Sequence, residues 1–237
     1  MFKAVVFDLY GTLVDNYGYA AELAGYEALL ARMAEVLGMA AGEYDRHWRE
    51  SYGDRVVGLF ASLEDELREV AARAGCAADD ERVALAAALR RNFIGKYLLV
   101  PRPDAVETLA ELRRRGIKTG LLTNCSQDTA SLWPESPLSE HVDVPLLSCA
   151  VGLKKPDPAV FQLACQRLEL EPNQVIYLAD GEGHELAAAG SAGLTPVLIR
   201  TSYKDPPFHR QPHVEPWDGI EIAWLKDVID LALGVEA

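Results

Sequence analysis

Positive charge is scarce in this chain, and no long apolar run is present. The 237 residues include 36 Asp and Glu against 23 Lys and Arg, which gives a formal net charge of −13. The main basic cluster, residues 113–115, precedes Gly116 at a predicted helix end, where cations complement the helix dipole. We therefore expect no nucleic-acid partner and no binding to an anionic membrane. No apolar stretch is long enough to cross a bilayer.

Cysteine is also scarce. The four cysteines, Cys76, Cys125, Cys149 and Cys165, show no C-x-x-C pair and no zinc-ligand spacing. A reducing compartment is the simplest interpretation. The N-terminus has the pattern of a strand, not of a basic segment followed by an apolar stretch and a cleavage site. We therefore expect a soluble, cytoplasmic protein.

Two patterns of hydrophobic residues are present. Between residues 16 and 97 apolar side chains recur only at helical spacing, as in Val56, Phe60, Leu63, Leu67 and Val70. Outside this block, apolar strands alternate with helices, which is typical of a parallel sheet covered on both faces. The expected strands lie near residues 3–8, 117–123, 144–148, 175–179 and 195–199.

This alternation predicts an α/β fold, a Rossmann-like parallel sheet sandwich formed by residues 1–15 and 98–237. Residues 16–97 are predicted to be an inserted all-helical cap domain. Ser62, Asp104 and Asp157 are expected to begin helices, and a further helix is expected near Glu182. We expect residues 205–218 to form a loop and residues 220–233 a final helix.

Polar residues follow the ends of several predicted strands or lie in loops near them. In parallel sheets, ligands bind at the carboxyl ends of the strands. Residues far apart in the sequence are therefore candidates to meet at one edge. In chain order these residues are a carboxylate, a hydroxyl, a cation and a second carboxylate: Asp8, Thr123, Lys155 and Asp180. Such a set is suited to hold and attack an anionic substrate, with a metal ion present.

The chain resembles the haloacid dehalogenase superfamily of hydrolases over essentially its whole length, and the inserted cap fits a large subgroup. The resemblance implies that Asp8 attacks the substrate and forms an aspartyl ester or aspartyl phosphate. It also implies that Thr123 hydrogen-bonds the transferring group and that Lys155, rather than Lys154, offsets charge beside the nucleophile. The matching segments are Asp8-Leu9-Tyr10-Gly11-Thr12, Thr123-Asn124, Lys155-Pro156-Asp157-Pro158, and Asp180 followed by Glu185.

Tyr10 departs from the phosphatases of this superfamily. They usually carry a second Asp at this position, which protonates the leaving oxygen and then activates water. Tyrosine, with an unperturbed pKa of about 10, is a poor base at neutral pH. The Asp-x-Tyr-Gly-Thr-Leu form resembles instead the L-2-haloacid dehalogenases, in which halide leaves without a proton.

Two features oppose the dehalogenase interpretation. Those enzymes capture halide with a cap arginine, and an alignment on Trp48-Arg49 places Ala40 at that position. They also lack the acidic character of the loop that contains Asp180, Glu182 and Glu185. Carboxylates close to one another raise each other's pKa unless a cation lies among them.

A Mg²⁺ ion bound by Asp8, the backbone carbonyl of Tyr10 and Asp180 would relieve this repulsion. We expect Glu185 to pair with Lys155. Glu182 is expected either to contact the metal ligands without binding the metal itself, or to lie in the first turn of a helix. The side chains expected beside the substrate are Tyr10, Thr12 and Asn124, although Asn124 is equally suited to turning the chain after its strand.

We therefore predict a Mg²⁺-dependent phosphatase that acts on a small phosphorylated metabolite through an aspartyl-phosphate on Asp8. The alternatives are a metal-independent L-2-haloacid dehalogenase and a binding protein of the same fold with weakened catalysis. A phosphonate hydrolase would need a cap lysine, and Lys96 lies at the very edge of the cap. The relatives implied by the resemblance allow either a monomer or a homodimer.

Overall fold

A parallel sheet lies at the centre of the molecule. The computed structural model describes residues 1–14, 20–200 and 216–234. Its described strands form a six-stranded sheet in the order β3-β2-β1-β4-β5-β6, with every neighbouring pair parallel. Their bounds are β1 (Ala4–Phe7), β2 (Lys118–Thr123), β3 (Val144–Leu147), β4 (Val175–Ala179), β5 (Thr195–Ile199) and β6 (Ile220–Ile222).

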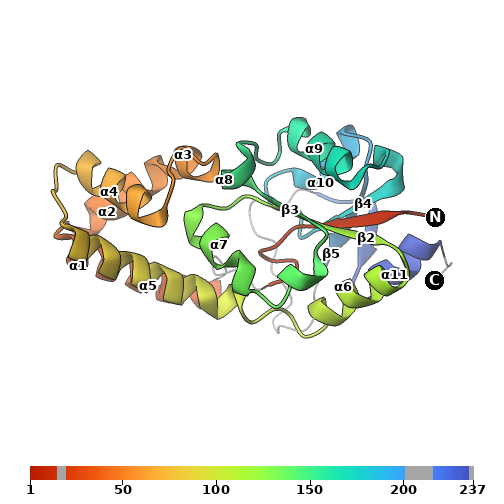
Figure 1. Cartoon of the computed structure of the whole chain (residues 1–237), viewed down its shortest axis with the longest axis horizontal. Coiled ribbons are helices and arrows are strands. Elements are labelled where there is room, and N and C mark those ends of the chain that lie inside the picture. The colour runs from red at the N-terminus through yellow and green to blue at the C-terminus, as the bar shows by residue number, and fades with distance from the viewer. Residues whose placement is uncertain (15–19, 201–215, 235–237) are drawn as a thin grey trace.

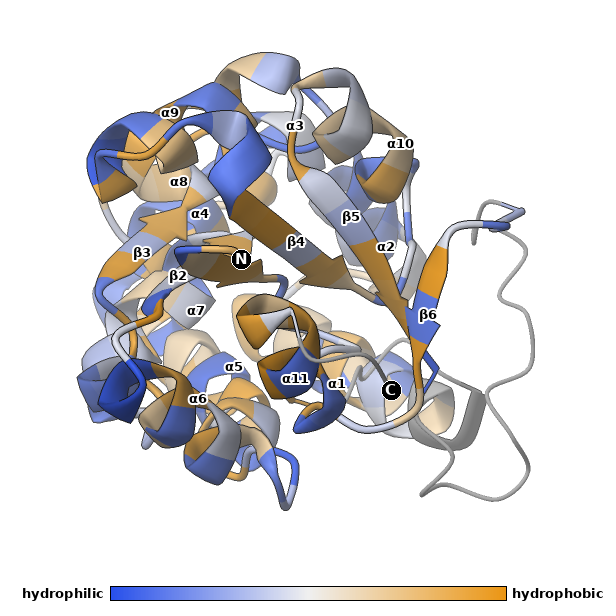
Figure 2. Cartoon of the chain, turned by 90° about the vertical axis from the view of Figure 1, so that its right-hand side faces the viewer, coloured by the Kyte–Doolittle hydropathy of each residue, from blue (hydrophilic) through white to orange (hydrophobic). Residues whose placement is uncertain are grey.

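The first strand lies between β2 and β4, where the strand order reverses. Phe7 is in register with Leu121 of β2 and with Leu178 of β4, so the three strands reach the same edge together. All four residues of β1 are buried. Figure 2 shows β4 as hydrophobic along its length, with helices on both sides. Strands covered on both faces need such continuous apolar sequences, and the reversal places a crevice at their carboxyl ends.

Helices cover both faces of the sheet (Figure 1). Val5 and Phe7 pack in one core with α6 (Ala105–Arg114) and α11 (Asp227–Leu233). Ala4 and Val6, which alternate with them, pack in another core with α9 (Pro158–Leu168) and α10 (Glu185–Ser191). Shorter elements complete this part: α7 (Gln127–Leu132), α8 (Ser148–Val151), and the 3-10 turns η1 (Trp133–Glu135), η2 (Ser139–His141) and η3 (Pro172–Gln174).

Helices α1 to α5 gather at one end of the molecule, away from the sheet (Figure 1), and we call them the cap. They have an apolar core of their own, which includes Met33, Leu37, Leu67, Val70 and Val83. Their bounds are α1 (Ala20–Leu37), α2 (Ala41–Glu50), α3 (Tyr52–Val56), α4 (Leu63–Arg73) and α5 (Asp80–Leu98). No described helix has the length and apolar character needed to cross a membrane.

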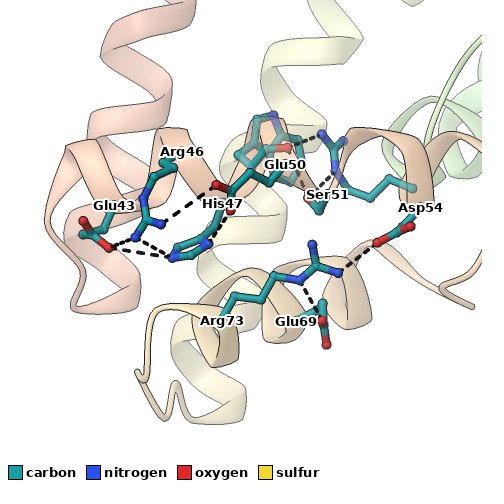
Figure 3. A network of polar contacts seen from close by, with 10 residues as sticks. Glu43, Arg46, His47, Glu50, Ser51, Asp54, Glu69 and Arg73 are labelled. Carbon is teal, nitrogen blue, oxygen red and sulfur yellow. Dashed lines mark hydrogen bonds and ion pairs between the residues drawn. The ribbon is translucent and has the colours of Figure 1, made fainter.

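Polar contacts join neighbouring turns and helices on the outside of the cap (Figure 3). Arg46 pairs with Glu43 within α2. Arg73 of α4 lies 2.8 Å from Glu69 of its own helix and 2.9 Å from Asp54 of α3. Partly exposed pairs of this kind contribute roughly 0–1 kcal/mol each to stability. The buried apolar side chains therefore hold the cap together, and the Arg73–Asp54 contact adds a tie between α3 and α4.

The predicted parallel α/β sheet is confirmed, and so are several predicted helix starts. Ser62 caps α4 by accepting a hydrogen bond from the backbone N–H of Asp65, at 3.1 Å. Asp157 caps α9 by accepting from the N–H of Ala159, at 2.9 Å. The helix expected near Glu182 begins at Glu185.

The prediction of one final helix over residues 220–233 was wrong at its start. Ile220-Glu221-Ile222 forms strand β6, in register with Val197 to Ile199 at the sheet edge, and α11 begins only at Asp227. The alternation of apolar and polar residues over three positions is too short a pattern to distinguish strand from helix. Of the loop expected at residues 205–218, residues 205–215 lie outside the described part, as does the predicted start of the cap at residue 16.

Candidate active site

Asp8 stands at the carboxyl end of β1, in a turn built by the residues that follow it. The N–H groups of Leu13 and Val14 both donate to the carbonyl of Leu9, at 2.8 and 3.0 Å. Gly11 has a φ of 85°, a conformation that glycine adopts without steric strain. Thr12 lies inside the turn, and its Oγ1 donates to Asp8 Oδ2 at 3.3 Å. The Asp8 side chain is buried and fixed from one side by this turn.

Lys155 is the central cation of the site. Its Nζ lies 2.5 Å from Asp8 Oδ1, 2.6 Å from Glu185 Oε2 and 3.1 Å from the hydroxyl oxygen of Tyr177. The Tyr177 hydroxyl also donates to Glu185 Oε2, at 2.6 Å. The expected ion pair between Glu185 and Lys155 is thus present. We call Asp8, Lys155, Tyr177, Asp180 and Glu185 the active-site cluster.

Asn124 holds the loop that carries Lys155. Its Nδ2 donates to the Lys155 carbonyl at 2.9 Å, and its Oδ1 accepts from the Lys155 N–H at 2.8 Å. These contacts tie Asn124 to the loop of Lys155, and its two expected roles, binding substrate and turning the chain after its strand, stay predictions. Thr123, which precedes it, is buried at the end of β2. Lys154 lies outside the cluster, with its Nζ 6.0 Å from the centre of the Tyr52 ring of the cap.

Three carboxylates converge in the described part of this site. Asp8, Asp180 and Glu185 each offer an oxygen, and these three oxygens lie within 4.8 Å of one another. Glu185 Oε1 is buried and has no hydrogen-bond partner among the described residues. Glu182 is exposed, and its backbone N–H donates to Asp180 Oδ1 at 3.3 Å.

The electrostatics reflect this excess of negative charge. Burial, followed by the charges of Asp8 and Asp180, raises the pKa of Glu185 to about 8, although Lys155 opposes the shift. Burial alone would lower the pKa of Lys155, but Asp8 and Glu185 outweigh it and raise that pKa above its ordinary value. Lys155 therefore stays charged, and burial and the neighbouring carboxylates hold the pKa of Glu185 above its ordinary value.

These oxygens fit a hard divalent cation. Mg²⁺ prefers oxygen ligands and is commonly held by one or two carboxylates together with substrate oxygens. Asp8 and Asp180 offer such carboxylates, and the unpartnered Oε1 of Glu185 stands beside them. The backbone carbonyl of Tyr10, expected as a further ligand, remains a prediction.

The side chain of Tyr10 points to the segment that follows β2. Its hydroxyl oxygen lies 2.9 Å from Thr129 Oγ1 of α7, in a partly buried position. A phenol bound in this way does not supply the carboxylate that many relatives implied by the resemblance carry at this position.

A second buried group of charges joins the cap to the sheet domain, and the sequence analysis missed it. Arg90 Nε of α5 lies 2.7 Å from Asp128 Oδ2 of α7. Arg55 Nη1 of α3 donates to Ser126 Oγ at 3.3 Å. Glu66 Oε1 of α4 accepts from the backbone N–H of Gln127 at 3.0 Å. We call Arg55, Glu66, Arg90 and Asp128 the interface cluster.

The interface cluster is tied to the segment that follows β2, since Ser126 to Asp128 come one residue after Thr123-Asn124. The guanidinium of Arg55 stacks 3.6 Å above the Trp48 ring, and burial lowers its pKa. Burial raises the pKa of Glu66 to about 7. One signal was available in the sequence: Arg90 falls on the apolar face of α5, among Val83, Ala87 and Ile94.

Comparison with known proteins places this geometry in context. Residues 2–193 match the model of a family of hydrolases described as haloacid dehalogenase-like. The chain is 26% identical to (S)-2-haloacid dehalogenase 4A of Burkholderia cepacia over 232 residues, which cover 94% of this chain and 93% of that protein.

Phosphatases are similar to the chain as well. Glyceraldehyde 3-phosphate phosphatase of Methanopyrus kandleri is 30% identical over 212 residues, which cover 86% of this chain and 87% of the relative. The solved structure of an HAD phosphatase from Thermococcus onnurineus superposes with a TM-score of 0.64 at 22% identity, covering 99% of both chains. Sequence similarity thus extends over most of the chain to two kinds of hydrolase.

Proposed function

The chain belongs to the haloacid dehalogenase-like hydrolases, and within this family we propose that it is a Mg²⁺-dependent phosphatase of small phosphorylated metabolites. One observation carries the proposal: three carboxylates of the described site converge within 4.8 Å, and Lys155 pairs with two of them, Asp8 and Glu185. A haloacid substrate would add one more negative charge. A divalent cation that also binds phosphate oxygens would neutralise the excess.

Asp8 is the proposed nucleophile. Thr12 fixes one carboxylate oxygen and Lys155 the other, so the side chain is held in one orientation for attack on phosphorus. Attack by a carboxylate oxygen forms the aspartyl-phosphate, and the bond to the leaving oxygen breaks. Water then hydrolyses this intermediate, which releases phosphate and restores Asp8. Lys155 and the hydroxyl of Thr123 would bind the oxygens of the transferring group.

Asp8 and Asp180 would hold Mg²⁺, with Glu185 beside them and the Tyr10 carbonyl as a predicted further ligand. Bound there, Mg²⁺ would supply positive charge that offsets the phosphate oxygens. Lys155 keeps Glu185 close to these ligands through the 2.6 Å ion pair.

The leaving group sets the expected substrate preference. Tyr10, bound to Thr129, replaces the carboxylic acid that would protonate a leaving alkoxide. General acid catalysis is typically worth ~10²–10⁴-fold in rate. Acyl phosphates and aryl phosphates, whose leaving groups need little protonation, are therefore expected to react faster than alkyl phosphates.

The second candidate is an L-2-haloacid dehalogenase, in which Asp8 forms an ester and halide leaves. Tyr10 favours it, because no proton is needed. Arg55 favours it as well: although Ala40 occupies the aligned arginine position, Arg55 brings a buried guanidinium from the cap to Ser126, two residues after Asn124. Against it, Arg55 is already engaged by Trp48, Ser51 and Ser126.

The experiment that tests the proposal measures phosphate release from p-nitrophenyl phosphate and acetyl phosphate, with Mg²⁺ and with EDTA. Asp8→Asn is expected to abolish release, and Asp45→Asn, at a partly exposed aspartate paired with Arg49 in the cap, serves as the matched control. Chloride release from 2-chloropropionate in EDTA, without phosphate release, would establish the dehalogenase instead. Stoichiometric metabolite binding with no turnover would favour the binding protein.

A further inference from the structure

Two buried thiols face each other beside the active site. The Sγ atoms of Cys125 and Cys149 lie 4.0 Å apart, and both side chains are almost fully buried. All four cysteines lie within the described residues, and all are free thiols. Among the described residues Cys125 and Cys149 contact each other through sulfur, while Cys165 and Cys76 lie elsewhere in the fold.

The sheet holds the two thiols in register. Thr123 of β2 is the Cα partner of Leu147 of β3, and each cysteine follows its strand residue by two positions. Ser148 Oγ reinforces the alignment, since it accepts from the Cys125 N–H at 2.9 Å and donates to the Cys125 carbonyl at 3.1 Å. Both cysteines follow neighbouring parallel strands, and their sulfurs lie 4.0 Å apart, so a bridge needs the sulfurs to approach by about 2 Å.

The two thiols are chemically unequal. The hydrogen bond from Cys125 lowers the pKa of Cys149, whereas the same contact and burial raise the pKa of Cys125. Cys149 is therefore the first of the two to become a thiolate, which is the form that reacts with peroxide. Cys125, 4.0 Å away, is placed as the resolving thiol.

Both cysteines belong to segments that matter for the hydrolase. Cys125 follows Asn124, whose side chain holds the N–H and the carbonyl of Lys155. Cys149 lies against the cap: a Cβ atom at Gly58 would overlap its carbonyl oxygen. A disulfide needs the sulfurs ~2.05 Å apart, so closing the pair draws these segments together and shifts the loop of Lys155 or the cap contact.

We propose that Cys125 and Cys149 form a peroxide-sensitive dithiol whose oxidation to a disulfide lowers the hydrolase activity. The Cys149 thiolate attacks one oxygen of hydrogen peroxide and becomes a sulfenic acid as the O–O bond breaks, and the other oxygen leaves as water after protonation. The Cys125 sulfur then attacks the sulfenic sulfur, the S–S bond forms, and a second water leaves. Two electrons pass from the thiols to the peroxide. Cytosolic disulfides of this kind are usually transient and redox-sensing.

The experiment treats the full-length protein with hydrogen peroxide, blocks remaining thiols, and measures intact mass and cross-linked peptides. We expect a loss of ~2 Da, as disulfide formation requires, a peptide joining Cys125 to Cys149, and reversal by dithiothreitol. A variant with Cys76→Ser and Cys165→Ser is expected to behave like the parent protein. Cys149→Ala and Cys149→Ser are expected to lose the cross-link while keeping the thermal unfolding midpoint close to that of the parent.

The effect on activity is measured on the same samples and rests on the proposed function only through the choice of substrate. The assay uses whichever of p-nitrophenyl phosphate or 2-chloropropionate the reduced protein turns over. We expect at least about a tenfold fall on oxidation, since a displacement of ~1 Å can reduce a rate ~10²-fold, and recovery with dithiothreitol. Peroxide that adds oxygen without a cross-link, or a cross-link that leaves turnover unchanged, would overturn the proposal. The mass measurement tests for the disulfide independently, so its result remains valid even if the protein is not a phosphatase.

Discussion

Two groups of buried charges in this molecule are balanced differently. In the active-site cluster three carboxylates converge within 4.8 Å, and Lys155 pairs with two of them, Asp8 and Glu185. In the interface cluster Arg90 pairs with Asp128 at 2.7 Å, the charge of Arg55 also lowers the pKa of Asp128, and burial raises the pKa of Glu66 to about 7. The interface can neutralise itself. In the active site three carboxylates converge on one described lysine-centred group, and we propose that a divalent cation and an anionic substrate bind there.

The comparison predicts that breaking the active-site cluster affects turnover most, and that breaking the interface cluster affects stability most. Buried charges that lose a partner destabilise a protein by ~3–5 kcal/mol. A group that stabilises charge in a transition state contributes ~10²–10³-fold to the rate. Variants of the two clusters should therefore separate in a plot of activity against unfolding free energy.

The largest effect is expected from Lys155→Met. It removes the ammonium that contacts both Asp8 and Glu185, so the carboxylates repel one another and the nucleophile loses its orientation. We expect a fall of about 10³-fold or more in kcat for phosphate release, judged against the ~10²–10³-fold typical of one such group. The matched control is Lys154→Met, which lies outside the cluster and should retain full activity. Equal losses in both variants would contradict the assignment.

The next effect is expected from Arg90→Met, which leaves Asp128 buried without its 2.7 Å partner. The free energy of unfolding in urea should fall by ~3–5 kcal/mol, while kcat per folded molecule changes only a few-fold. Arg91→Met is the control, because Arg91 pairs with Glu64 at a partly exposed site and such pairs contribute ~0–1 kcal/mol. The comparison fails if Arg90→Met abolishes turnover in protein that remains folded.

A smaller effect is expected from pH at Glu66. Burial raises its pKa from 4.5 in the unfolded chain to about 7 in the folded protein, so the folded state holds the proton more tightly. The resulting stabilisation is complete below pH 4.5 and is lost as pH rises towards 7. Glu66→Gln, which mimics the protonated side chain, should remove this dependence, worth ~2–3 kcal/mol. Glu185 contributes a dependence of the same sign in both proteins.

The measurement is the free energy of unfolding between pH 4.5 and 8 for the parent protein and for Glu66→Gln. The difference between them isolates Glu66 from Glu185. Parallel curves would show that Glu66 is ionised in both states, and the account of the interface as self-neutralising would then be wrong.

The smallest effect is expected from Mg²⁺ without substrate. Binding to the folded protein alone should raise stability, by about 1.4 kcal/mol when the ion is at about 10 times its Kd. Thermal unfolding with and without MgCl₂ measures this. Asp180→Asn should reduce the shift and Arg90→Met should keep it, because the two substitutions lie in different clusters. The same shift in Asp180→Asn as in the parent would show that the ion binds elsewhere.

Much of the active site could be predicted from the sequence because its residues follow strand ends. Asp8, Asp180 and Thr123 lie at the carboxyl ends of β1, β4 and β2, and parallel pairing brings such ends to one edge. The Pro-Asp-Pro that follows Lys155 favoured it over Lys154 as the lysine of the site. In the structure Lys155 Nζ contacts Asp8 Oδ1.

The residues that the sequence analysis missed act through contacts that no local pattern specifies. Tyr177 lies inside the apolar strand Val175–Ala179. Its hydroxyl joins the site only because it hydrogen-bonds Lys155 and Glu185, which come from other elements. Arg90 and Glu66 are single charges on helix faces that otherwise pack against apolar neighbours. Their partners come from α7, a helix of six residues with too short a pattern to be predicted.

The most direct test of the central claim is the rate of phosphate release from acetyl phosphate as free Mg²⁺ is titrated into protein first treated with EDTA. We predict a rate that rises from the uncatalysed background to a plateau, and Asp8→Asn that stays at background throughout. A rate that stays at background at every Mg²⁺ concentration, together with chloride release from 2-chloropropionate in EDTA, would contradict the claim that the excess of carboxylates serves phosphoryl transfer.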